Sequence, residues 1–144
     1  MYSKLKINTP SLIINKNKII NNIKKMKVFS DKNKIDLRPH SKSHKMVKIA
    51  KTQLKYGAIG VCVATLYEAE VMINNGIKGV LLTTPITNNK DKLRLKNLFK
   101  ISNTFMIIID NIYSIKFLNS ITKALNKKIN VLVDCDIMLV GKNK

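Results

Sequence analysis

The sequence is poor in several residue types, and each shortage limits what the protein can be. It has no tryptophan, two cysteines, two histidines, and 8 acidic against 27 basic residues, which gives a formal net charge of +19. Cys62 and Cys135 lie in separate apolar stretches and do not form a disulfide framework. No apolar run approaches the roughly 20 residues of a membrane span, and no uninterrupted apolar core of a secretory signal is present near the start. We therefore expect a cytoplasmic protein without a membrane segment.

The length also limits the fold. A chain of 144 residues suits a single domain, and its 45% hydrophobic content is typical of a globular protein. A closed (β/α)8 barrel needs roughly 250 residues. The chain is too short to form such a barrel alone.

The excess of positive charge raises the question of nucleic-acid binding. Of the 27 basic residues 25 are lysine, and they are spread along the sequence together with 17 asparagines and 21 isoleucines. Nucleic-acid surfaces more often combine arginine with aromatic side chains on one stripe. Lys, Asn and Ile are what A+T-rich codons encode, so we expect solvated charge and no specific nucleic-acid site. A lysine-rich polyanion binder, with steep salt dependence, is the alternative.

Helix-like and strand-like segments alternate along the chain. Helices are predicted at 17–29, 44–56, 66–75, 90–100 and 112–126, and strands at 12–14, 35–42, 59–64, 79–83, 105–109 and 129–134. Such alternation is typical of β/α units on a parallel sheet. The last five strands start at regular intervals, which suits a barrel at least as well as an open sheet. No glycine-rich dinucleotide fingerprint or phosphate-binding loop follows any strand.

Local signals mark some helix ends. Gly57 and Gly76 stand where helix C-cap glycines belong. Thr65 is placed to cap the helix that starts at residue 66, and Glu68 occupies the position that a capping box requires.

Both histidines and one of the two arginines fall within residues 37–45. If 35–42 is a strand, its alternation places Arg38, His40 and Lys42 on one face. The carboxyl ends of parallel strands are where α/β folds place their active sites. Repulsion among three basic groups, together with burial, favours a neutral, nucleophilic amine at Lys42, which is the chemistry of a Schiff-base lysine.

The same residues also allow simpler interpretations, in which they have no catalytic role. The segment is also compatible with a solvated strand end. His40 and His44 are four residues apart and could form a weak metal pair, although no third histidine or nearby carboxylate completes it. Pro39 is unusual within a strand and suggests a bulge, an edge or a first strand.

The residues from Arg38 to Lys45, Arg-Pro-His-Ser-Lys-Ser-His-Lys, resemble the Arg-Pro-His-x-Lys-Thr-His-Lys signature of the D-serine dehydratase and D-threonine aldolase family. These are pyridoxal-phosphate enzymes with the alanine racemase N-terminal barrel. Further similarity lies in residues 9–14, 53–54, 60–65, 68–70 and 75–77. The resemblance implies that Lys42 is catalytic and holds pyridoxal 5'-phosphate covalently as a Schiff base. His40 and Arg38 would be its cofactor-binding neighbours, and the substrate would be a small D-amino acid.

The family pattern breaks near residue 136. Met138 stands where the family has a glycine, and Gly141 where it has an active-site arginine. Relative to the family, the second barrel half and the C-terminal β-domain with its metal site are missing. We therefore expect residues 1–144 to form a single partial domain, an α/β structure of parallel β/α units that is part of a TIM-type (β/α)8 barrel truncated after about five strands.

This comparison predicts the N-terminal portion of a pyridoxal-phosphate-dependent D-amino acid lyase without a metal site of its own. The alternative is a catalytically inactive cofactor-binding relic. Open strand edges and exposed apolar faces would favour a homodimer or a complementing C-terminal fragment as partner.

Overall fold

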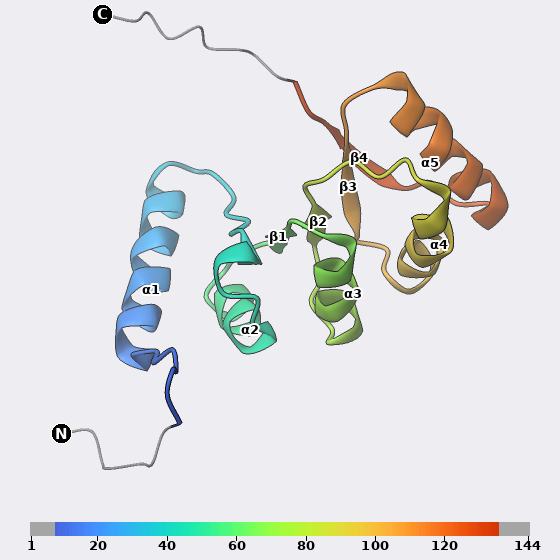
Figure 1. Ribbon diagram of the computed structural model, residues 1–144. Helices are drawn as coiled ribbons and strands as arrows, with labels where there is room; N and C mark the ends of the chain where they lie inside the picture. Colours follow the sequence, from blue (N-terminus) through green and yellow to red (C-terminus); the bar gives the residue numbers. More distant parts are fainter. Residues whose placement is uncertain (1–7, 136–144) are drawn as a thin grey trace, which may run out of the picture.

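The computed structural model describes residues 8–135, in which helices alternate with short strands (Figure 1). The elements in chain order are α1 (Lys16–Lys32), the 3-10 turn η1 (Ser41–Ser43), α2 (Val47–Lys55), β1 (Val61–Val63), α3 (Leu66–Asn74), β2 (Val80–Leu82), the 3-10 turn η2 (Asn89–Asp91), α4 (Lys92–Ile101), β3 (Met106–Ile109), α5 (Ile112–Leu125) and β4 (Asn130–Val133). Each of the five predicted helices is therefore present. Gly57 and Gly76 follow α2 and α3 with φ values of +97° and +80°, which confirms the predicted glycine helix ends.

The four strands form one sheet in the order β1-β2-β3-β4, and every neighbouring pair is parallel. Spatial order thus follows chain order, as it does around a barrel of successive β/α units. In Figure 1, α3, α4 and α5 lie along the sheet, while α1 stands beyond α2 at the end opposite α5. The predicted fold class, an α/β structure that is part of a barrel, is confirmed.

The core lies between the sheet and the helices. The strand register aligns Val63 with Leu82 and Leu82 with Ile107, and these three side chains are fully buried. Phe99 of α4 packs against Phe105 with ring centroids 4.8 Å apart. Burial of each large apolar side chain stabilises the fold by about 1.5–3 kcal/mol, so this layer holds the strands in register.

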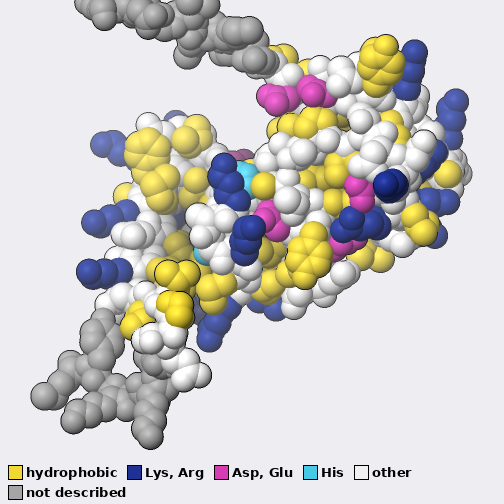
Figure 2. Space-filling model, viewed as in Figure 1, with side chains coloured by type: hydrophobic (Ala, Val, Ile, Leu, Met, Phe, Trp, Pro, Cys, Tyr) yellow, Lys and Arg dark blue, Asp and Glu magenta, His cyan; other side chains and the backbone are white. Residues whose placement is uncertain are grey.

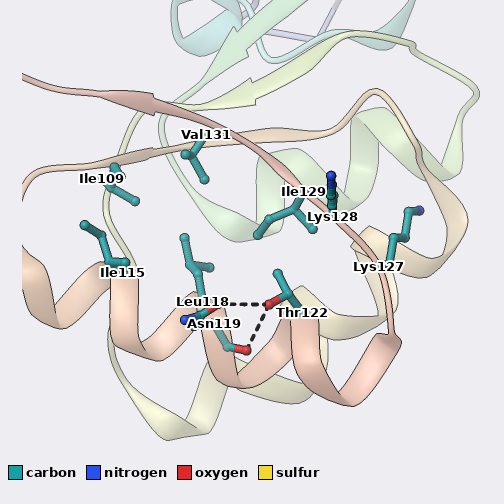
Figure 3. Close-up of a pocket in the computed structure, with 9 residues that line it drawn as sticks. All are labelled: Ile109, Ile115, Leu118, Asn119, Thr122, Lys127, Lys128, Ile129 and Val131. Carbon is teal, nitrogen blue, oxygen red and sulfur yellow. Dashed lines mark hydrogen bonds between the residues drawn. The ribbon is translucent and has the colours of Figure 1, made fainter.

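The outermost strand, β4, is exposed along its whole length. Val133 is 68% exposed, and Val131 borders a groove of about 360 Å³ between α5 and the sheet. Figure 3 shows Ile115 and Leu118 of α5 facing Ile109 and Val131 across this groove. Among the described residues β4 pairs with β3 on one side only, and such an open side beside an apolar groove is expected at the edge of a sheet that forms part of a barrel.

Two predicted strands are not formed. Residues 12–14 contain no strand, and Leu12 is fully exposed. The segment 35–42 forms only one parallel bridge, between His40 and Cys62. Pro39 has no N–H to donate, and the chain turns into η1 at Ser41, so a continuous ladder cannot develop.

Lysine and arginine side chains are scattered over the face shown in Figure 2 and do not form a single stripe. Within residues 8–135, no helix has both the length and the apolar character needed to cross a bilayer.

Candidate functional site

Polar residues follow the strands at one edge of the sheet. Thr83 follows β2, Asp110 follows β3 and Asp134 follows β4, while His40 lies beside β1 through its bridge to Cys62. The carboxyl ends of parallel strands meet at this edge, where α/β folds carry their ligands. The candidate site is therefore built on residues 40–45 and the polar groups beside them.

Lys42 lies in η1, directly after the segment that runs along β1. Ser41 is almost fully buried and fixes the turn, because its Oγ donates to the Cys62 carbonyl at 3.0 Å. The side chain of Lys42 is exposed, so the predicted burial of this amine is wrong. Lys42 lies in a 3-10 turn and not in a strand, so the alternation of a strand does not determine its side. Among the described residues, its amine has no ion-pair partner.

His40 contacts both the turn and β2. Its Nδ1 accepts a hydrogen bond from the Lys42 N–H at 3.2 Å, and its Nε2 lies 3.2 Å from the Thr83 Oγ1. Partial burial lowers the pKa of His40 below 6.5, and the Lys42 charge lowers it further, while Glu68 acts in the opposite direction. The structure thus brings His40 and Lys42 together, with the imidazole favoured in its neutral form.

Arg38 contacts the sheet at the end opposite to that of His40. Its Nη1 donates to the carbonyl of Gly79, which immediately precedes β2. Gly60 allows this close approach, because a Cβ at that position would overlap the Gly79 carbonyl and lie 2.7 Å from the Arg38 Nη1. The guanidinium is therefore engaged with backbone at the amino-terminal end of β2 and is not brought next to Lys42.

Glu68 is a site residue that the sequence identified only as part of a helix cap. Thr65 accepts the Glu68 N–H at 3.2 Å, as predicted for the start of α3. The carboxylate of the buried residue Glu68 accepts the Ala64 N–H at 2.8 Å and pairs with Lys45 at 3.2 Å. Burial alone would raise the pKa of Glu68, but the Ala64 hydrogen bond and Lys45 together hold it below its ordinary value. An ionised carboxylate therefore lies beside the turn that carries Lys42.

His44 has a different role from His40. Its Nδ1 accepts the Met46 N–H at 3.0 Å at the start of α2, and burial lowers its pKa. Its Nε2 is buried, and the Gln53 side chain opposes the effect of burial on the His44 pKa. In the same part of the chain, no three His, Cys, Asp or Glu side chains are grouped to hold a metal ion. The predicted departures from the family pattern at Met138 and Gly141 lie outside the described residues.

The arrangement has a definite chemical capacity. Lys42 carries a solvent-accessible primary amine at the carboxyl edge of a parallel sheet, and its backbone N–H binds a histidine ring that favours the neutral form. Such an amine can attack a carbonyl compound, and the amine or the imidazole can exchange protons with what is bound there.

Comparison with known proteins supplies the family. The domain described as "Alanine racemase, N-terminal domain" matches residues 14–139. D-Threonine aldolase of Arthrobacter sp is 26% identical over 132 residues, covering 92% of this chain and 35% of the relative. 3-Hydroxy-D-aspartate aldolase of Paracoccus denitrificans is 30% identical over 131 residues, covering 90% of this chain and 34% of the relative.

A solved structure extends this similarity to the fold. The crystal structure of D-threonine aldolase from Filomicrobium marinum superposes with a TM-score of 0.86 at 32% identity, covering 90% of this chain and 35% of that one. The chain thus spans about a third of the length of the curated relatives it matches. It belongs to the family of the alanine racemase N-terminal domain, and its parallel β/α units form part of that family's barrel.

Proposed function

We propose that Lys42 binds pyridoxal phosphate covalently, as part of a lyase that acts on D-amino acids with a hydroxyl group on Cβ. The observation that carries this proposal is the position of Lys42. It is an exposed lysine in a turn anchored to β1, beside a histidine whose ring accepts the lysine's own N–H. An amine held in this way at the carboxyl edge of parallel strands is suited to an aldehyde-bearing cofactor.

The substrate class follows from what the relatives have in common. Their names are D-threonine aldolase, 3-hydroxy-D-aspartate aldolase, D-threo-3-hydroxyaspartate dehydratase and D-serine dehydratase. Every substrate in these names is a D-amino acid with a hydroxyl on Cβ. The reactions differ only in whether the Cα–Cβ bond or the Cβ–O bond breaks. We infer the same substrate class for the protein of which these β/α units are part.

The described residues fit the part of such a site in which a lysine amine binds the cofactor. Lys42 would hold the cofactor, and His40 would present a neutral ring next to it. Arg38 would support the site indirectly, by tying its segment to the start of β2 through the Gly79 carbonyl. Pyridoxal phosphate supplies, when bound, a conjugated ring that takes up the electron pair left on the substrate Cα.

The chain's own groups account for binding and proton transfer. Ser41 fixes the position of the turn by its hydrogen bond to the Cys62 carbonyl. Lys42 would hold the cofactor, and its amine would serve as the base: it would take a proton from the substrate Cα if water is lost, or from the Cβ hydroxyl if the Cα–Cβ bond breaks, and would return a proton to the product. His40 orients the Lys42 backbone through Nδ1 and adds no positive charge while it is neutral.

Titration with pyridoxal phosphate tests the proposal. A saturable visible absorbance band is expected for the natural sequence and for the control Lys51→Ala, which removes an exposed lysine of α2. Lys42→Ala should lack the band. An equal band in Lys42→Ala would overturn the assignment, because the other 24 lysines would then account for the binding.

The reaction is tested separately, with protein saturated with pyridoxal phosphate. D-Threonine should give glycine and acetaldehyde if the Cα–Cβ bond is cleaved, and D-serine should give pyruvate and ammonia if water is eliminated. Specific cofactor binding at Lys42 without either product would support the inactive cofactor-binding alternative.

A further inference from the structure

The turn that carries Lys42 ends in an unfavourable backbone conformation. Lys45 has a φ of +48°, in the left-handed region that non-glycine residues seldom adopt. The Ser41 carbonyl accepts the N–H groups of both His44, at 3.1 Å, and Lys45, at 2.7 Å. Such a conformation persists only where neighbouring contacts hold it. The contacts made by the side chains at both ends of the turn must therefore hold this conformation in place.

The two ends of the turn are fixed to different elements. Ser41 is bound to β1 through the Cys62 carbonyl, and Lys45 pairs with Glu68 in the first turn of α3 at 3.2 Å. Lys42 lies between these two anchors. The Lys45 side chain is 67% exposed, whereas that of Glu68 is 9% exposed. The buried partner is thus the carboxylate, which favours keeping its countercharge in place.

Glu68 makes more contacts than the capping of α3 requires. In a capping box the carboxylate accepts the N–H of the cap residue, which here is Thr65. Glu68 uses Oε2 to accept the N–H of Ala64, one residue earlier, while the Thr65 N–H makes a smaller contribution to its lowered pKa, and its Oε1 faces Lys45 outside the helix. One carboxylate thus joins the end of β1, the start of α3 and the turn of residues 41–45.

We propose that Glu68 is a positioning residue for Lys42: its ion pair with Lys45 holds the turn of residues 41–45 against α3 and fixes the position from which the Lys42 amine reacts. This inference rests on the proposed function of Lys42. The effect of Glu68 is indirect, because it acts through Lys45 and the backbone and not through contact with the cofactor. The negative charge of Glu68 also raises the pKa of His40, whereas the positive charge of Lys42 lowers it.

The test breaks this ion pair from each side. Glu68→Gln removes the charge but keeps an oxygen to accept the Ala64 N–H, and Lys45→Met removes the ammonium but keeps the alkyl chain. Glu70→Gln is the matched control on the same helix, because it breaks only the pair of Glu70 with Arg94 of α4. Pyridoxal phosphate affinity is measured by absorbance titration, and the order of the turn by amide hydrogen exchange.

Both pair-breaking variants should bind the cofactor about tenfold more weakly, and the double variant no more weakly than either single one. Lys45→Arg keeps the ion pair with Glu68 and should retain the natural affinity for pyridoxal phosphate. Glu70→Gln should also match the natural sequence. The amides of Lys42 and Lys45 should exchange faster in Glu68→Gln and Lys45→Met only. A cap-only role for Glu68 would leave Lys45→Met at natural affinity.

The outcomes separate this inference from the proposed function. Unchanged affinity and exchange in Glu68→Gln, with normal binding in the natural sequence, would overturn the positioning role alone. If the natural sequence does not bind the cofactor at Lys42, the proposed function fails. The hydrogen-exchange comparison then still decides whether Glu68 orders the turn.

Discussion

The Nε2 atom of His40 lies 3.2 Å from the Oγ1 atom of Thr83. Thr83 donates its own hydroxyl hydrogen to the Val63 carbonyl at 3.0 Å, so its oxygen can only accept from His40. The Nδ1 of His40 in turn accepts the Lys42 N–H. Both bonds are satisfied only by a neutral imidazole with its hydrogen on Nε2, in agreement with the lowered pKa of His40.

This relationship predicts the tautomer of His40. Long-range ¹H–¹⁵N NMR at pH 7.5 should show the Nε2–H form, and the chain's two histidines make assignment simple. Thr83→Val should lower the free energy of unfolding by about 1–2 kcal/mol, because the ring loses its acceptor and the Val63 carbonyl loses a donor. Thr84→Val, which removes the exposed bond to the Ala64 carbonyl, is the control and should cost less. An Nδ1–H tautomer would contradict the described bonds.

Stability should decrease in mild acid. The folded-state pKa values of His40 and His44 both lie below the ordinary 6.5, so protonation favours the unfolded chain. The stability that the two neutral histidines contribute is fully present above pH 6.5. It is lost as the pH falls through that value toward the folded-state pKa values. Urea unfolding at pH 7.5 and pH 5.5 measures the difference. The pKa of Glu68 is lowered from 4.5, so its titration lies below this window.

The control for this pH effect is the double variant His40→Gln, His44→Gln. It should show a smaller change in unfolding free energy between the two pH values. An equal change in the variant and the natural sequence would assign the pH dependence to other groups.

Gly60→Ala should be strongly destabilising. The new Cβ would overlap the backbone carbonyl of Gly79 and crowd the Arg38 guanidinium, and backbone atoms between paired segments cannot move aside cheaply. We expect a loss of about 2 kcal/mol or more in unfolding free energy. Gly76→Ala is the matched control, because its φ is +80° but no atom lies within 4 Å of its Cβ position. It should cost only about 1 kcal/mol for the left-handed backbone. Equal losses would show that the close approach at Gly60 is unimportant.

The exposed edge strand should promote association of the chain. Val133 of β4 is 68% exposed and its neighbours along the strand are exposed too. Val133→Lys should reduce self-association in sedimentation experiments, because a charge on an edge strand opposes pairing. Unfolding free energy should stay within about 0.5 kcal/mol of the natural value. Unchanged association would mean that β4 is not the contact surface.

Sequence patterns predicted the parts of this structure that depend on local signals and periodicity. Thr65 and Gly57 marked helix ends because capping is local, and the apolar run of residues 59–64 predicted the buried parallel strand β1. The strand predicted at 35–42 was overestimated, because Pro39 limits pairing and η1 diverts the chain.

The tertiary details of the site could not be predicted in the same way. The alternation that placed Arg38, His40 and Lys42 on one face assumed a strand as far as Lys42. In the structure Arg38 binds the Gly79 carbonyl, 41 residues away in sequence, and the ion pair between Lys45 and Glu68 joins two separate elements. Such contacts depend on how β1 and β2 pack, which periodicity does not specify.

The most direct test of the central claim is to reduce the protein with borohydride in the presence of limiting pyridoxal phosphate and to map the modified peptides by mass spectrometry. The account predicts that the phosphopyridoxyl label is concentrated on Lys42, because this lysine lies in the anchored turn beside His40 and its amine, unlike that of Lys45, has no ion-pair partner among the described residues. Labelling of the exposed lysines Lys48 and Lys51 of α2 should stay at background. A label spread evenly over Lys42, Lys48 and Lys51 would contradict the account and leave Lys42 an ordinary surface lysine.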